Sequence, residues 1–257
     1  MIKNSWVICQ KELRSYFYSP IAYVVITIFV VIAGYFFQNI LGSYVQLSMY
    51  AMREPELTQY LNFTDGIFGP LFGNLTVILL LMMPLLTMRL LAEEKRAGTF
   101  ELLLTYPLRE IETVLGKFFA GVLVLSLMLA LTAVYPLYLS FLGPIEVGAL
   151  LTNYFGLLLM GSAFIAFGLL ASALTSNQII AAVISFGALL IFWLIGFPAY
   201  GQDPALGGIL RHLSLLQHFE NFAKGVIASQ DVIYYLNFTF FCLFLTLRAL
   251  ESNKWRG

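Results

Sequence analysis

The chain has 257 residues, of which 60% are hydrophobic and only 11% are charged, and its 14 basic and 14 acidic residues cancel to zero net charge. Soluble domains carry about 25% charged residues, so this composition excludes an ordinary soluble domain and indicates a membrane protein. The balanced charge gives no electrostatic basis for nucleic-acid binding, and no nucleic-acid partner is expected.

The first 19 residues differ from the rest because they mix apolar and basic positions. In NSWVICQKELRSYFYSP, apolar residues such as Trp6 and Phe17 alternate with polar ones such as Lys11 and Arg14. This pattern predicts an amphipathic helix that lies on the cytoplasmic leaflet and ends at Ser19-Pro20. A basic flank that only orients the first membrane span is the simpler alternative.

Six apolar runs are long enough to cross about 30 Å of hydrocarbon as helices. None of them contains Asp, Glu, Lys, Arg or His. The fold class expected is therefore an all-α polytopic membrane protein with one transmembrane domain over residues 1–257. In chain order the runs are Pro20–Leu41, Pro70–Met88, Phe118–Leu142, Leu150–Ala173, Gln178–Pro198 and Val232–Leu247.

The basic residues are distributed unevenly between the two sides of these runs. If the N-terminus is cytoplasmic, 11 of the 14 Lys and Arg residues lie inside, and only Arg53, Arg211 and Lys224 lie outside. Positive residues gather on the cytoplasmic side of membrane proteins. Both termini are therefore expected in the cytoplasm.

The segment 199–231 is expected outside and opens with the turn-rich stretch YGQDPALGG. The following ILRHLSLLQHFENFAKGV has apolar residues at helical spacing, which predicts an amphipathic helix on the outer surface or folded back on the bundle. His212 and His218 lie in it, six residues apart. That spacing does not suit two metal ligands on one helix face, and we interpret them as unrelated surface histidines.

Small residues recur in the fourth run. Gly168, Ser172 and Ser176 are spaced four residues apart, which lets two helices approach closely. The partner helix could belong to the same chain or to another subunit.

The sequence shows no energy source of its own. The runs lack the ionisable side chains that ion-coupled carriers usually place in their spans, although a sodium site lined by backbone carbonyls stays possible. There is no G-x-x-x-x-G-K-[ST] phosphate loop and no hydrolase or zinc-protease motif. We expect a non-catalytic chain without cofactor or metal, and energy for any work would have to come from a partner.

One dense group of charges could receive such a partner: the charged segment, Ala92–Glu110, AEEKRAGTFELLLTYPLRE. We expect a solvated helical extension of the second run that stops at Ala97-Gly98, then a short helix over Thr99–Thr105. The helix into the third run should begin near Arg109, Glu110 and Glu112. A plain solvated hairpin would need neither the exposed leucines nor the acids, which contribute little to topology, so the pattern favours a docking handle.

The longer stretch EEKRAGTFELLLTYPLREIETVLGK resembles the segment between the second and third spans of type 2 ABC-exporter permeases. The stretches KELRSYFYSPIAYVVITIF and FENFAKGVIASQDVIYY also resemble this family, so the similarity covers nearly the whole chain. The start YFYSPIAY is most similar to permeases of gliding-motility-associated transporters, and next to those that serve copper-site maturation of nitrous oxide reductase. The positions that match the motif are Glu94, Lys95, Arg96, Gly98, Thr99, Glu101, Leu103, Leu104, Pro107, Gly116 and Lys117.

The resemblance implies a multi-pass protein of the bacterial inner membrane that pairs with a second permease copy or a related permease. A separate ATPase subunit, which binds ATP and Mg²⁺, would dock on the first cytoplasmic loop, 89–117. The resemblance leaves open whether the protein exports a substrate or transmits movement without one. It also leaves open whether an accessory membrane or periplasmic protein takes part. The residues alone also leave a secondary carrier or channel. The docking residues expected are Glu93, Glu94, Lys95, Arg96, Gly98, Thr99, Phe100, Glu101, Leu103, Leu104 and Pro107.

Overall fold

The computed structural model describes residues 2–52, 62–98, 109–197 and 204–254, and these form helices joined by short connections, with no β-strand among them. The expected all-α class is confirmed. In chain order the elements are α1 (Ile2–Tyr18), α2 (Pro20–Ala51), the π-helical turn η2 (Thr64–Phe68), α3 (Gly69–Thr87), α4 (Ala92–Arg96), α6 (Glu110–Thr132), α7 (Val134–Ser140), α8 (Val147–Leu174), α9 (Gln178–Leu194), α10 (Pro204–Leu213), α11 (Leu215–Ala223) and α12 (Ser229–Lys254).

Five helical stretches in the described part of the chain are long and apolar enough to cross a membrane. Four of them contain one of the expected runs, and the third covers its run except for the last two residues, Phe141 and Leu142. The remaining run, Gln178–Pro198, forms the shorter apolar helix α9 of 17 residues, and its last residue lies outside the described residues. The five long stretches are Pro20–Ala51, Thr64–Arg96, Glu110–Ser140, Val147–Leu174 and Ser229–Ser252.

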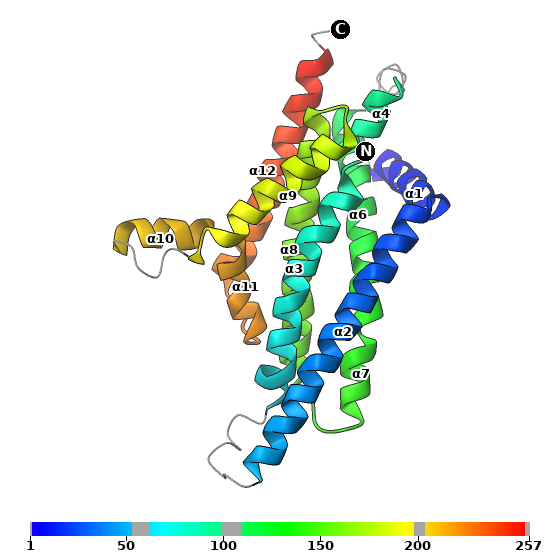
Figure 1. Ribbon diagram of the computed structural model, residues 1–257. Coiled ribbons are helices and arrows are strands. Elements are labelled where there is room, and N and C mark those ends of the chain that lie inside the picture. The colour runs from blue at the N-terminus through cyan, green and yellow to red at the C-terminus, as the bar shows by residue number, and fades with distance from the viewer. Residues whose placement is uncertain (1, 53–61, 99–108, 198–203, 255–257) are drawn as a thin grey trace.

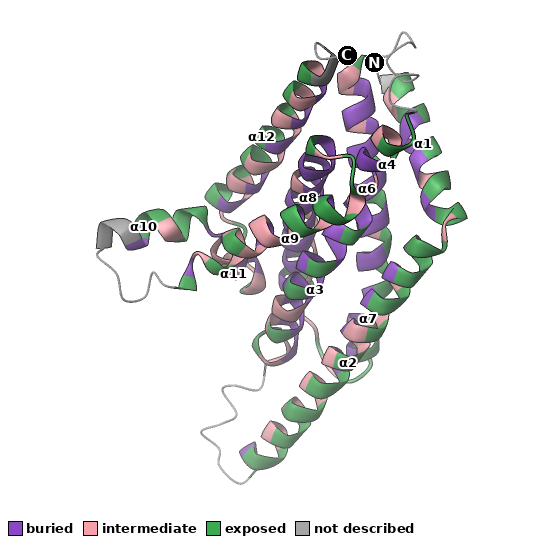
Figure 2. Cartoon of the chain, turned by 45° about the horizontal axis from the view of Figure 1, so that its top comes forward, coloured by how far each residue is buried: buried purple, intermediate pink, exposed green. Residues whose placement is uncertain are grey.

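Helix α8 lies at the centre of the bundle and packs against α3, α6, α9, α11 and α12. Figure 2 shows burial concentrated on α3, α6 and α8, whereas α2, α10 and α12 carry long exposed surfaces. Helices α1 and α4 and the C-terminal part of α12 gather at one end of the bundle, and α7 lies at the other (Figure 1). The charged segment therefore begins at the same end as the N-terminal helix.

The first span does not end where its apolar run ends. The apolar run ends at Leu41, but α2 continues to Ala51. Polar side chains there donate hydrogen bonds to carbonyls of their own helix: Asn39 to Tyr35 at 2.8 Å and Ser43 to Asn39 at 3.1 Å. Because these groups are satisfied within the helix, the loss of hydrophobicity does not terminate it.

The third run is not one helix. Helix α6 starts at Glu110, ends at Thr132, and a break at Ala133 separates it from α7. Pro136 explains the break, since it has no N–H to donate to the carbonyl of Thr132, four residues earlier.

The small residues of α8 bring it close to α3 in the same chain. A Cβ on Gly168 would overlap the side chain of Thr87, so only glycine allows this approach. Ser172 is fully buried one turn further on, whereas Ser176 is exposed beyond the end of α8. Two of the three small residues thus serve packing within the chain.

The single amphipathic helix expected in 199–231 is wrong, because the chain forms two helices there, α10 and α11. Ser214 separates them, and its hydroxyl accepts a hydrogen bond from the backbone N–H of Gln217 at 3.3 Å, capping α11. Helix α11 buries Phe219 and Phe222 against the bundle, and Gly156 of α8 makes room for the Phe222 ring. This second helix is folded back on the bundle.

Candidate functional site

The N-terminal helix α1 ends at Tyr18, directly before Ser19-Pro20, as the sequence predicts. Ser19 caps the following helix α2, which has Pro20 in its first turn. One side of α1 packs against α6. Ile8 and Gly116 meet there so closely that a Cβ on the glycine would lie 2.7 Å from the Cβ of Ile8. Trp6, in contrast, stays 53% exposed. Helix α1 is therefore held on the end of the bundle.

The charged segment begins with a turn that α8 stabilises. Between α3 and α4 the backbone N–H groups of Leu91 and Ala92 both donate to the hydroxyl of Ser172, at 3.0 and 2.9 Å. That hydroxyl donates to the carbonyl of Met88 at 3.0 Å. One buried side chain thus satisfies three backbone groups that the interruption of the helix leaves without partners.

Helix α4 is also held by Lys95, whose ammonium group donates to the carbonyl of Ala173 near the C-terminal end of α8. It ends where we expected: Arg96 is its last helical residue, Ala97 is the C-cap, and Gly98 has a φ of +68°. This left-handed conformation favours glycine. Glu93 and Arg96 are exposed.

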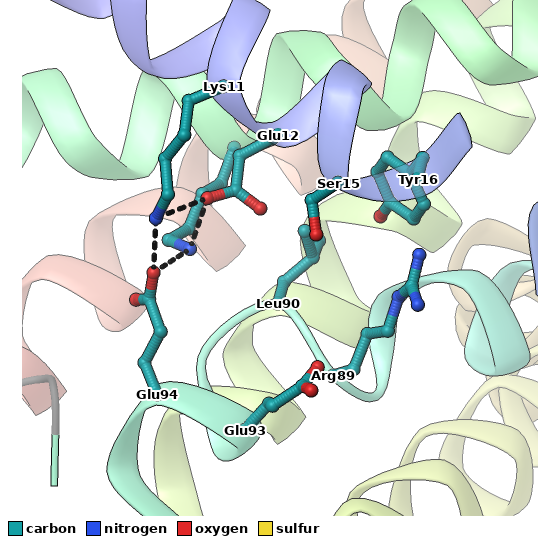
Figure 3. Close-up of a pocket in the computed structure, with 9 residues that line it drawn as sticks. Lys11, Glu12, Ser15, Tyr16, Arg89, Leu90, Glu93 and Glu94 are labelled. Atoms are coloured by element: carbon teal, nitrogen blue, oxygen red, sulfur yellow. Dashed lines mark hydrogen bonds and ion pairs between the residues drawn. The ribbon is translucent and has the colours of Figure 1, made fainter. Parts of the chain in front are cut away.

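Four charged side chains join α1, α4 and α6, and we call them the charge network: Lys11, Glu12, Glu94 and Lys117. The Lys117 side chain is 1% exposed, and its ammonium group lies 2.9 Å from Oε1 of both Glu12 and Glu94. Lys11 lies 3.0 Å from Glu94 and 3.3 Å from Glu12 (Figure 3). The formal charges sum to zero, so the buried lysine has the compensation that burial requires.

The expectation that Glu94 and Lys95 are solvated is wrong. The Glu94 side chain is only 14% exposed, since it faces Lys117, and Lys95 is half-buried against α8. Burial alone would lower the pKa of Lys11, but Glu12 and Glu94 outweigh this effect and raise it. Lys11 therefore remains a cation at neutral pH.

A cavity of about 130 Å³ lies next to the charge network and separates α1 from the end of α3. Across it, the Arg89 guanidinium lies over the ring of Tyr16, 4.8 Å from the ring centre (Figure 3). The Tyr16 hydroxyl donates to the carbonyl of Leu86 at 2.9 Å. Helix α1 is thus joined to α3 as well as to α4 and α6.

The start of α6 follows the sequence prediction. Arg109 is the N-cap, and the Glu112 carboxylate accepts the Arg109 backbone N–H at 3.0 Å. The same carboxylate accepts two contacts from the Asn4 side-chain amide, at 3.2 and 3.3 Å. Asn4 belongs to α1, so this cap adds a further connection between α1 and α6.

The structure places five of the predicted docking residues, Glu93, Glu94, Lys95, Arg96 and Gly98, on or just after α4. The short helix expected over Thr99–Thr105 lies outside the described residues. So do the other six predicted docking residues: Thr99, Phe100, Glu101, Leu103, Leu104 and Pro107. Sequence reasoning missed Glu12 and Ser172 as partners of this segment. Lys117, a cation directly before an apolar run, was the signal that a nearby acid had to neutralise it.

The two histidines are not an unrelated surface pair. His218 is buried, and its Nδ1 lies 2.6 Å from Oδ1 of Asp231. His212 is exposed, and its ring meets that of His218 edge to face, with 5.5 Å between the ring centres. Among the described residues no group of three His, Cys, Asp or Glu side chains could hold a metal ion.

Comparison with curated proteins gives no match. A family model described as ABC-2 family transporter protein matches residues 6–246. The match begins in α1, includes the charged segment and ends in α12, and so covers far more than half of the 257 residues. The chain belongs to the ABC-2 family of transporter proteins and is a membrane permease subunit of an ABC transporter.

Proposed function

We propose that a separate ATP-hydrolysing subunit docks on residues 93–107 of this permease subunit and drives it from the cytoplasm. The observation that carries this proposal is the two-sided environment of α4. Ser172 and Lys117 hold its start and Glu94 against the bundle, while Glu93 and Arg96 remain exposed. A docked protein would therefore meet a charged surface that cannot move independently of the helices behind it.

The contacts behind α4 suggest how a displacement would spread. Glu94 contacts Lys117 of α6 and Lys11 of α1, and the turn before α4 is bonded to Ser172 of α8. Movement imposed on α4 by ATP binding or hydrolysis would reach three helices through direct polar contacts. ATP and Mg²⁺ belong to the partner in this proposal, and none of this chain's residues takes part in hydrolysis.

The proposed arrangement has six spans and both termini in the cytoplasm of a bacterial inner membrane. Helix α9 would complete the six spans and be the fifth in chain order. Its 17 residues equal the shortest length that crosses a bilayer, about 17 residues. The permease would work as a dimer with a second copy or a related chain. It would export a substrate or transmit movement to outer partners, and gliding motility is the most specific role that its resemblance supports.

Docking is tested by co-purification of the ATPase subunit with full-length variants. Glu93→Lys and Glu101→Lys should weaken recovery in a salt-dependent way, because exposed charges contribute about 0–1 kcal/mol each. Phe100→Asp should abolish most recovery, because a buried apolar side chain contributes about 1.5–3 kcal/mol. The matched control is Glu251→Lys, the same charge reversal near the end of α12, where Glu251 pairs with Arg248.

The control should retain the ATPase at the wild-type level over the whole salt series. Wild-type recovery in all three charged-segment variants would place the docking site elsewhere. Loss of recovery in Glu251→Lys alone would move it to the C-terminal end of the chain.

A further inference from the structure

Helix α11 is joined to both of its neighbours in the chain through one histidine ring. His218 is 6% exposed, and its Nδ1 lies 2.6 Å from Oδ1 of Asp231 on α12. Its Nε2 lies 3.1 Å from the backbone carbonyl of His212 on α10. The second oxygen of Asp231 accepts the Asn221 side-chain amide at 2.7 Å.

Both ring nitrogens of His218 therefore face oxygen acceptors. A neutral imidazole carries one N–H, so it can satisfy only one acceptor and turns a lone pair toward the other. The imidazolium donates to both. We propose that protonation of His218 is a switch that closes α10 and α11 onto the start of α12.

The surroundings of the ring favour a cation. The Tyr234 ring stacks on His218 with 3.9 Å between ring centres and a 20° interplanar angle, an arrangement that stabilises a positive charge. The hydroxyls of Tyr234 and Tyr235 are already engaged, because they donate to the carbonyls of Leu213 and Leu215 at 2.7 Å.

Among the described residues, Asp231 is the carboxylate that contacts the ring. Glu220, on α11 itself, accepts from Gln217 at 3.0 Å. The cations of these elements are Arg211 on α10 and Lys224 directly after α11. The exposed ring of His212 lies edge-on to it. Helices α3, α8 and α9, which also pack against α11, contain no charged side chain within their bounds.

The sign of the pH dependence follows from proton counting. In the closed arrangement His218 is an imidazolium that donates from both nitrogens. In the open arrangement the ring faces water and is neutral at neutral or alkaline pH, so it carries one proton fewer. Closing therefore binds a proton, so low pH favours the closed form and rising pH favours opening. The change is measured over about pH 5 to 8.

Hydrogen–deuterium exchange of the full-length protein in lipid nanodiscs tests the switch. Protection of residues 215–223, corrected for the intrinsic pH dependence of exchange, should fall about tenfold as pH rises through that range, because local opening controls exchange. Residues 157–173 of α8 should keep constant protection and report that the bundle stays folded.

Asp231→Asn separates the switch from simple packing. A neutral His218 can then donate from Nε2 to the His212 carbonyl and accept at Nδ1 from the new amide, whose oxygen accepts from Asn221. Helices α10 and α11 should then stay closed on α12 with a neutral ring, so protection of residues 215–223 should no longer fall as the pH rises. His212→Gln, the control, keeps the backbone carbonyl and should titrate like the wild type.

The proposal would be overturned by a wild type without pH response, by an Asp231→Asn variant whose protection still falls as the pH rises, or by a His212→Gln variant without pH response. If the Asp231→Asn variant loses protection in α8, its bundle is no longer folded, and the His218→Gln variant tests the proposal instead. It should show no pH response over residues 215–223, and a response that persists there would mean that another group titrates.

Discussion

Lys117 carries its charge at a position that side chains almost completely enclose. Its side chain is 1% exposed, and its ammonium group has two carboxylates at 2.9 Å. Lys11 contacts the same two acids, but its side chain is 59% exposed. The two lysines therefore share partners and differ in burial, which makes them a natural pair for measurement.

Lys117→Met should destabilise the protein by about 2–4 kcal/mol, because it leaves buried acids with only one exposed cation. Lys11→Met should cost about 0–1 kcal/mol, as expected for an exposed ion pair. Thermal unfolding in detergent, followed by monodisperse recovery on size-exclusion chromatography, measures both. Equal losses in the two variants would show that burial of Lys117 does not govern the energetics of the charge network.

The charge network also shows how far residue-level prediction reaches. Lys11, Lys117 and Glu94 stand out in the sequence as charges next to apolar runs. Their partnership depends on how α1 folds back over α6, since Lys117 and Glu12 are 105 positions apart. Local patterns give no information on such a pairing, and the solvated interpretation of Glu94 failed for that reason.

At the scale of elements, the Ser172 hydroxyl supplies hydrogen bonds that a continuous helix would make at the junction of α3 and α4. Ser172→Ala should leave the N–H groups of Leu91 and Ala92 buried without an acceptor, at a cost of about 1–3 kcal/mol. Amide exchange over residues 88–96 should accelerate. Ser176→Ala, four residues later and exposed, should change neither stability nor exchange, and acceleration in both variants would argue against a specific role for Ser172.

The positions of the helices could be predicted from hydrophobicity, but their ends could not. The apolar runs located the five long stretches because burial in lipid demands apolar side chains. Helix α2 continues past its apolar run, where polar side chains donate hydrogen bonds to carbonyls of their own helix, and hydropathy does not register these bonds. The break before α7 depends on one proline within an otherwise apolar run. The helix ends at Gly98 and Ser19 could be predicted from the sequence, because capping is a local property.

For the whole molecule, the bias in basic residues predicts the topology and the length of α9 makes it testable. A reporter after Gly257 and one inserted at Ser176, in the connection between α8 and α9, should both be cytoplasmic. A reporter near Asp203 should be on the opposite side. If α9 does not cross the membrane, the reporters at Ser176 and Asp203 will lie on the same side, and the proposal that α9 is a span will be wrong.

The charge network also bears on how the protein is made. Glu12 and Glu94 both precede Lys117 in the chain, and synthesis proceeds from the N-terminus. When α6 enters the bilayer, the two acids that neutralise its lysine have therefore already left the ribosome. A lysine buried without them would cost several kcal/mol in a membrane. Insertion of α6 thus depends for its charge balance on segments made earlier and on none made later, which gives the assembly of the bundle a direction.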